Sequence, residues 1–325
     1  MTISIHRFCL VLLFICFAIS AGFAAAQTYP TKPIRVILPF PPGGSTDAVL
    51  RQLAPRLSDS LGQQVIIDNR PGGATMIAME LVAKSAPDGY MVGVVTLTYV
   101  VNPSLFSKIP YNSEKDFARV SLVTIVPLVL TVHPSVPARS VKELIALAKA
   151  KPGVLNYASY GNGSAAQMAM EQFKYLTGTN MVHVPFGANI NPLLAVLSGE
   201  NSLIYASIAA TLPHIQTGKL VALGVSAAKR VSTVPDIPTM VEAGVPGYEA
   251  VEFQGIVVPA GTPSAVINRL NQEFVKALKA PDMKERLENI GAYAVGNTPE
   301  EFENYIKKES ATWSKVIKAA GIHFD

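Results

Sequence analysis

A short β-branched run, a glycine-containing turn and a stretch with helical periodicity follow one another repeatedly along this chain. The first unit predicts a strand at 34–38, a turn at 39–44 and a helix at 45–61. The same order of strand, turn and helix returns at 65–84. Because strands that alternate with helices are typical of a sheet covered by helices, the pattern predicts an α/β fold.

Two longer β-rich segments, 120–132 and 251–258, interrupt this alternation. A chain of this length is near the limit for one hydrophobic core, so we expect two lobes joined by these two segments. The predicted limits are 27–127 and 253–325 for lobe 1 and 128–252 for lobe 2. Further strands are expected at 92–97, 156–159 and 220–225, and further helices at 141–150, 164–176, 264–280, 281–290 and 299–320.

The first 26 residues differ from the rest of the chain. Arg7 precedes an unbroken apolar run at 8–19, and three alanines at 24–26 stand before Gln27. The apolar run is shorter than the ~20 residues that a spanning helix needs, and small residues close it at a cleavage position. We therefore expect residues 1–26 to be a cleaved signal peptide and the protein to be periplasmic. An uncleaved membrane anchor is the alternative.

Composition excludes several classes of function. Both cysteines, Cys9 and Cys16, lie inside the signal segment, so the mature chain is expected to have no disulfide and no thiol chemistry. The net charge is only +4, with 15% charged and 49% hydrophobic residues, which indicates a well-packed globular protein. No run of basic residues suggests a nucleic-acid partner.

Two strand-to-helix turns carry the strongest signal for a binding site. The segment 39–47, PFPPGGSTD, places glycines and hydroxyl side chains where a helix begins, and 157–167, YASYGNGSAAQ, repeats this chemistry. Unpaired backbone N–H groups at a helix start attract anions, and glycine lets a ligand approach the backbone closely. Two such turns facing each other would hold a carboxylate without Lys or Arg. A tight bend with no ligand is the simpler alternative for either turn alone.

Residues that would support catalysis or a cofactor are few. The histidines of the mature chain form no i, i+4 pair, and neither glycine turn has the spacing of a phosphate or dinucleotide loop. Ser164 is followed by Ala165-Ala166, so the hydrolase pattern Gly-x-Ser-x-Gly is not met. We interpret His183 as a polar residue at a strand end, and Asp47 as a helix cap or an acceptor that fixes its loop. We expect no enzyme activity, no metal site and no cofactor.

Over essentially the whole mature chain the sequence resembles the Bug-type receptors, the extracytoplasmic solute-binding proteins of tripartite tricarboxylate transporters. The resemblance rests on PFPPGGSTD (39–47), NRPGG (69–73), PDGY (87–90), NPSLF (102–106), YASYGNGS (157–164), VHVPF (182–186) and PAGTP (259–263). It implies a two-lobed periplasmic-binding-protein fold, type II-like, with two crossing strands. It also implies that the ligand carboxylate is held by the first turn of lobe 1 and by the turn at 159–164.

The expected ligand-binding residues come from the two turns and from positions beside them. They are Phe40, Gly43, Gly44, Ser45, Thr46, Asp47, Tyr99, Ser159, Tyr160, Gly161, Gly163, Ser164, Gln167, Phe186 and Ala206. Relatives often have His at 167 and Tyr at 186, and acidic residues where this chain has Ser202 and Ala206. If those acids hold an amino group, their absence disfavours an amino-acid ligand.

We therefore expect a receptor that captures a small organic carboxylate for the membrane permease subunits of an uptake system, acting as a monomer. A binding protein that reports its ligand to a membrane sensor is the first alternative. A secreted hydrolase or lyase is the second and less favoured alternative.

Overall fold

The computed structural model describes residues 29–187 and 191–324, so the expected signal peptide lies outside the described residues. The strands are β1 (Ile34–Leu38), β2 (Val65–Asn69), β3 (Met91–Val95), β4 (Phe117–Val132), β5 (Asn156–Ser159), β6 (Val182–Pro185), β7 (Leu203–Ser207), β8 (Val221–Val225), β9 (Val251–Pro259) and β10 (Tyr293–Ala294). The helices are α2 (Ser45–Leu61), η2 (Gly73–Thr75), α3 (Met76–Ala83), α4 (Leu97–Leu105), α5 (Val141–Ala150), α6 (Ala165–Thr177), α7 (Pro192–Leu197), α8 (Ile208–Gln216), α9 (Ser264–Leu278), α10 (Pro281–Asn289) and α11 (Pro299–Ala320).

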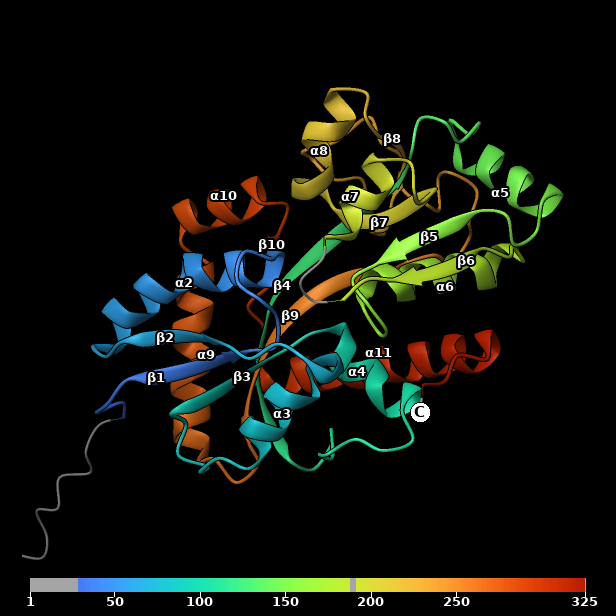
Figure 1. Cartoon of the computed structure of the whole chain (residues 1–325). Helices are drawn as coiled ribbons and strands as arrows, with labels where there is room; N and C mark the ends of the chain where they lie inside the picture. The colour runs from blue at the N-terminus through green and yellow to red at the C-terminus, as the bar shows by residue number, and fades with distance from the viewer. Residues whose placement is uncertain (1–28, 188–190, 325) are drawn as a thin grey trace, which may run out of the picture.

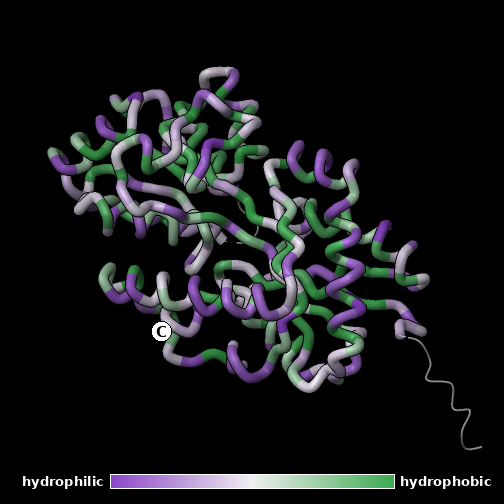
Figure 2. Tube along the Cα trace, turned by 180° about the vertical axis from the view of Figure 1, so that it is seen from behind, coloured by the Kyte–Doolittle hydropathy of each residue, from purple (hydrophilic) through white to green (hydrophobic). Residues whose placement is uncertain are grey.

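Helix ends follow signals in the sequence. α2 stops at Gly62, which adopts a φ of 69° and donates its N–H to the carbonyl of Ser58. α11 begins with a capping box in which Thr298 and Glu301 satisfy each other's backbone N–H groups. The helices alternate hydrophobic and hydrophilic residues along their turns, as expected when one face packs on a sheet (Figure 2).

The sheet order is β2-β1-β3-β9-β4-β7-β5-β6, with β8 and β10 also pairing with β4. β1 lies parallel to β2 and β3, and β5 lies parallel to β6 and β7. β4 is antiparallel to β9 up to Pro127 and antiparallel to β7 from Leu128 onward. One long strand therefore connects two groups of parallel strands (Figure 1).

The chain passes a second time between the two groups through β9. Ala250 donates its N–H to Ser226, beyond β8, and the next residue, Val251, already pairs with Pro127. β4 and β9 contain the two segments that the sequence predicts to cross. The lobe limits 27–127 with 253–325, and 128–252, stay a prediction, because β4 runs through both groups without a break and β9 begins level with Pro127, where they meet.

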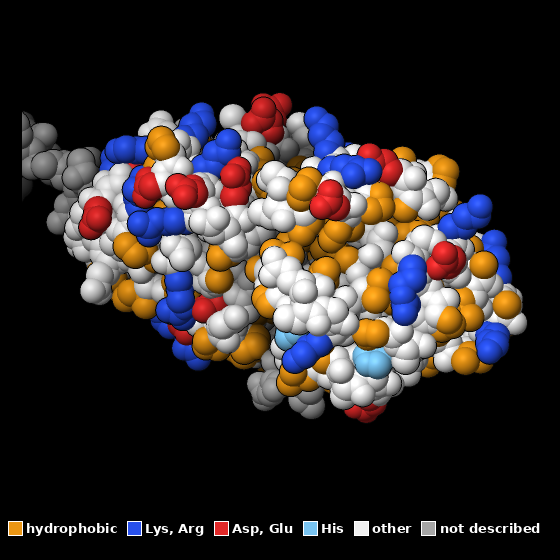
Figure 3. All heavy atoms as spheres, turned by 90° about the horizontal axis from the view of Figure 1, so that it is seen from above, with side chains coloured by type: hydrophobic (Ala, Val, Ile, Leu, Met, Phe, Trp, Pro, Cys, Tyr) orange, Lys and Arg blue, Asp and Glu red, His pale blue; other side chains and the backbone are white. Residues whose placement is uncertain are grey.

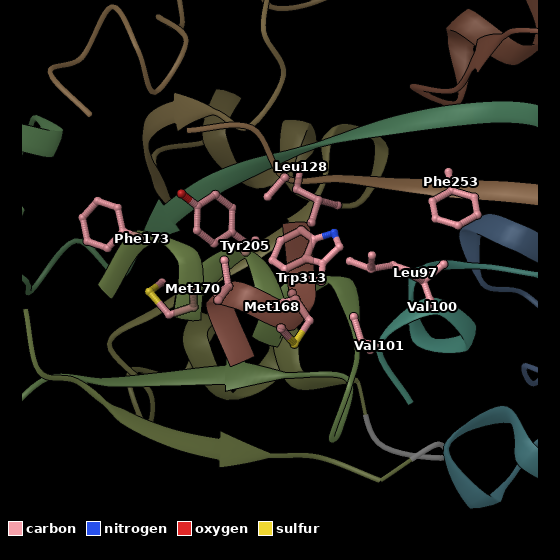
Figure 4. Packing of buried hydrophobic residues seen from close by; sticks show 14 of the residues in the cluster. Leu97, Val100, Val101, Leu128, Met168, Met170, Phe173, Tyr205, Phe253 and Trp313 are labelled. Carbon is pink, nitrogen blue, oxygen red and sulfur yellow. The ribbon is translucent and has the colours of Figure 1, made fainter. Parts of the chain in front are cut away.

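The largest hydrophobic cluster includes residues from both groups of strands. Figure 4 labels members of this cluster from α4, β4, α6, β7, β9 and α11, among them Trp313, which is 1% exposed. α11 contacts α4, β4 and α6. The C-terminal helix thus packs against both halves of the molecule.

The sequence-based prediction is wrong in one place that affects the site. The strand expected at 92–97 ends at Val95, and α4 follows at once from Leu97. β-branched residues extended the predicted strand to 97, but Leu97 to Asn102 are all buried in a helix, and packing overrides the weak local preference. None of the helices found among residues 29–187 and 191–324 is both long and apolar enough to cross a membrane.

Candidate functional site

The carboxyl ends of the parallel strands in the two halves face each other along β4. β3 ends at Val95, level with Gly255 and Leu122, whereas β7 ends at Ser207, level with Leu128. About six residues of extended strand, or about 20 Å, separate these two levels. α2, α4 and α6 begin directly after β1, β3 and β5, so their N-termini lie at the facing edges. Ligands of α/β sheets bind outside the carboxyl ends of strands.

The first predicted turn forms a rigid start to α2. Gly44 is the N-cap residue with an extended backbone, and Gly43 adopts a φ of 89°. Asp47 is buried and accepts hydrogen bonds from the Gly43 N–H (3.0 Å), Arg51 (2.8 Å) and Asn69 (3.0 Å). Desolvation opposes its ionisation, but these bonds hold the pKa of Asp47 below its usual range. The interpretation of Asp47 as an acceptor that fixes its loop is confirmed.

Asn69, the first residue of the NRPGG motif, connects β2 to this turn. Its side-chain amide donates to the carbonyl of Phe40 and to Asp47, both at 3.0 Å, and its oxygen accepts from Arg51 at 3.1 Å. The motif therefore supports the turn that carries Phe40, Gly43 and Gly44.

The second predicted turn is fixed by its own side chains. Ser164 caps α6, accepting from the Gln167 N–H and donating to the Gly161 carbonyl at 2.7 Å. The Gln167 side-chain oxygen accepts from the Gly163 N–H at 2.7 Å, and its amide lies 3.2 Å from Nδ1 of His183. The Ser159 hydroxyl lies 2.6 Å from Nε2 of the same histidine.

His183 therefore has a partner at each ring nitrogen, and its ring stacks on Tyr157. Desolvation, and then the positive charge of Lys174, lower the pKa of His183 to about 4. A neutral imidazole whose two nitrogens are both engaged supports the turn.

α4, which the sequence did not predict, brings two threonines to the site. The Thr98 hydroxyl donates to the carbonyl of Gly163 at 3.1 Å and so connects the two halves. The Thr96 hydroxyl, at the N-cap of α4, is buried and has no hydrogen-bond partner among the described residues. The sequence gave no signal for this role of Thr96 and Thr98, because their position depends on where α4 begins.

Sequence reasoning also missed Glu252, in the crossing strand β9. Its carboxylate lies 3.4 Å from the Ser45 hydroxyl and 3.3 Å from both the Thr46 hydroxyl and the Gln254 amide. Desolvation raises the pKa of Glu252 above its usual range, although these hydrogen bonds act in the opposite direction. Tyr160 lies close enough that its own pKa rises to about 12, first by desolvation and then by the charge of Glu252. Glu252 thus contacts the first predicted turn and is near enough to the second for its charge to act on Tyr160.

The family model for the tripartite tricarboxylate transporter family receptor matches residues 49–322. The chain belongs to this family. Protein BugT of Bordetella pertussis is 36% identical to this receptor over 94% of this chain and 95% of its own length. A protein from the tcbD-tcbE intergenic region of a Pseudomonas species is 34% identical over 91% of this chain and 92% of its own length.

Solved structures agree with this assignment. An R. palustris protein, Rpa4515 with adipate, matches with a TM-score of 0.85 and 34% identity, covering 91% of this receptor and all of that chain. MatC of Rhodopseudomonas palustris with bound malate matches with a TM-score of 0.81 and 30% identity, covering 89% of this receptor and all of that chain. The periplasmic binding protein BugD matches with a TM-score of 0.82 and 29% identity, covering 91% of this receptor and all of that chain. The expected α/β periplasmic-binding-protein fold is confirmed.

Three of the predicted site residues come from outside the two turns of the receptor, and their surroundings differ. Tyr99 is 1% exposed, and its hydroxyl contacts Arg119 and the Ser113 carbonyl, because one turn of α4 directs it into the core. Ala206 is buried in an apolar cluster, and Phe186 packs against that cluster while donating its N–H to Ser159. Phe186 thus adjoins the second turn, whereas Tyr99 is a core residue.

The charged surface of the receptor is mixed. On the face in Figure 3, Lys and Arg side chains alternate with Asp and Glu. Among the residues that the structure describes, no group of three His, Cys, Asp or Glu side chains is placed to hold a metal ion. Two shallow hollows, of about 320 and 390 Å³, lie beside α2 and include neither turn.

Proposed function

We propose that this receptor captures a small organic carboxylate in the periplasm and delivers it, as a monomer, to the permease subunits of a tripartite tricarboxylate transporter. The observation that carries the proposal is the pair of glycine turns at facing sheet edges, each opening a helix. Helix N-termini present backbone N–H groups and partial positive charge to an anion. The hydroxyls of Ser45, Thr46 and Thr96 add donors at the same edge.

Family membership and two neighbours support this chemistry. The solved relatives named with adipate and malate carry dicarboxylates, so dicarboxylates are the first ligands to test. The proposed ligand-binding residues are the turns 43–47 and 159–164, with Gln167 as a supporting residue, together with Thr96, Thr98 and Glu252.

A thermal-shift screen tests the proposal. The panel contains adipate, malate, other mono-, di- and tricarboxylates, aromatic acids, amino acids and neutral sugars. A ligand present at about 100 times its dissociation constant adds about 2.7 kcal/mol to the free energy of unfolding. We expect a carboxylate to raise the melting temperature and to be recovered unchanged by chromatography. Stabilisation by neutral sugars alone, or turnover of the stabilising acid, would contradict the proposal.

A further inference from the structure

The crossing strand β9 places an acidic side chain on the donors that the proposed function assigns to the ligand. Glu252 contacts the hydroxyls of Ser45 and Thr46 in the first turn of α2. Its own strand adds the Gln254 amide, which Thr124 of β4 contacts in turn. An anionic ligand that binds the start of α2 therefore meets a carboxylate of the protein at the same donors.

Among the residues that the structure describes, no Lys, Arg or His forms an ion pair with the Glu252 carboxylate. Its hydrogen-bond partners, Ser45, Thr46 and Gln254, are all neutral. Arg51 on α2 is already paired with Asp47. In the second turn, the Tyr160 phenol is neutral, because desolvation and then the charge of Glu252 raise its pKa. From β4, the residue paired with Glu252 is the apolar Val126.

Two carboxylates that share donors in a desolvated site cannot both remain ionised without a large penalty. The ligand is held by backbone N–H groups, which favour its charged form. Glu252 has only neutral donors and a surrounding that already disfavours its charge. The proton therefore goes to Glu252, whose protonated oxygen can then donate a hydrogen bond to the ligand.

We propose that Glu252 is a specificity-determining residue, and that the receptor takes up one proton at Glu252 when a carboxylate ligand binds at the start of α2. This inference rests on the proposed function. It predicts that affinity for a dianionic acid rises as the pH falls. The increase reaches at most about tenfold per pH unit and levels off once Glu252 is protonated in the free protein.

The experiment is titration calorimetry with adipate and malate at several values between about pH 6 and pH 8, where both acids are dianions, in buffers of different ionisation enthalpy. The buffer dependence of the heat counts the protons taken up. We expect uptake approaching one proton at the high end of the range and less at the low end. Glu252→Gln keeps the shape and the hydrogen bonds, so it should bind with no proton uptake and with an affinity independent of pH.

Glu249→Gln is the matched control, because Glu249 is exposed and only three residues away. It should keep the proton uptake of the wild type. Melting curves and circular dichroism verify that both variants fold.

Each outcome has one meaning. Tight binding by the wild type without proton uptake would overturn the inference and leave the proposed function intact. A different result is that the receptor loses affinity as the pH is lowered and prefers amino acids, with Glu252→Gln abolishing that preference. This result would overturn the inference and assign Glu252 to a ligand ammonium group. Binding by Glu252→Gln alone at neutral pH supports the inference. No binding of any carboxylate by either protein would overturn both proposals.

Discussion

Gly43 and Gly44 stand side by side, but their backbones differ. Gly43 has a φ of 89°, which favours glycine, whereas Gly44 has a φ of −77°. A Cβ at Gly44 would lie 4.0 Å from its nearest neighbour, the Pro41 carbonyl oxygen. The two glycines of the motif could be predicted from sequence, but their conformations could not. Space and an ordinary φ mean that a side chain at Gly44 should leave the fold intact.

We therefore predict that Gly44→Val changes the free energy of unfolding by less than about 0.5 kcal/mol but weakens binding of the selected carboxylate by about tenfold to a hundredfold. The reason is that a branched Cβ keeps the anion away from the backbone donors of α2. Gly44→Ala, with one methyl, should give a smaller loss. Calorimetry and melting curves measure both effects. A normally folded Gly44→Val that binds like wild type would remove this turn from the site.

Ser164 was expected to contact the ligand, but its hydroxyl already has two partners within the turn. We predict that Ser164→Ala lowers the free energy of unfolding by about 1 kcal/mol, the usual cost of losing an N-cap. Ser140 caps α5 in the same way, far from the turns, and is the matched control. Both variants should lose similar stability in denaturant titrations, and only Ser164→Ala should weaken binding. Equal binding by the two variants would show that Ser164 acts as a cap alone.

The half-buried position of His183 makes the free energy of unfolding depend on pH. The pKa of His183 is lowered in the folded protein to about 4, from about 6.5 in an unfolded chain. The unfolded state therefore binds the extra proton first. We predict that the contribution of neutral His183 to the free energy of unfolding is fully present above about pH 6.5 and is lost as the pH falls toward 4.

Allowing for partial exposure, the loss from His183 is about 1–2 kcal/mol. Denaturant titrations across this pH range measure it, and His183→Gln should show a flatter curve there. A variant with the same pH dependence as wild type would assign the acid sensitivity to other groups.

At the scale of elements, the sequence predicted β1, α2, β5 and α6 well, because glycine turns separate clear strand and helix patterns. It failed at α4, whose residues have the composition of a strand. The helix forms there because the sheet, α11 and the turn at 161–163 surround it, and these contacts are distant in the sequence. Thr96, Thr98 and Glu252 were missed because their surroundings are also formed by residues distant in the sequence.

The contact between α4 and the second turn can be tested by comparing two glycines that flank α6. Gly163 and Gly178 lie at the two ends of α6, with φ values of 75° and 64°. A Cβ at Gly163 would lie 3.2 Å from Leu105 and 3.5 Å from Thr98, whereas a Cβ at Gly178 meets open space.

Both Gly163→Ala and Gly178→Ala should lose about 1–2 kcal/mol of stability from backbone strain. Gly163→Ala should lose more, because its methyl also pushes the turn from α4, and it alone should weaken carboxylate binding. Paired denaturant and calorimetric titrations make the comparison. Equal effects of the two alanines on both quantities would mean that the contact between α4 and the turn has no role in binding.

At the scale of the whole molecule, two crossing strands and the facing turns indicate how the receptor could close on its ligand. Closing about β4 and β9 near 126–130 and 251–255 would bring Thr98 to Gly163, the contact between the halves that this structure shows. α11 packs on α4, β4 and α6, so its contacts must slide when the halves separate. A small hinge rotation about β4 and β9, with α11 sliding along the helices that it contacts, would allow the halves to close.

We predict that the carboxylate selected by the thermal-shift screen lowers the radius of gyration measured by small-angle X-ray scattering. The reason is that we expect the halves of the ligand-free protein to separate, and the bound anion to hold the start of α2 and the turn at 159–164 together. A neutral sugar that gives no thermal shift is the control, and a concentration series verifies that the particle is a monomer throughout. If the radius of gyration at saturating ligand equals that of the free monomer, the halves do not move, and the ligand must enter through side-chain motion at the turns.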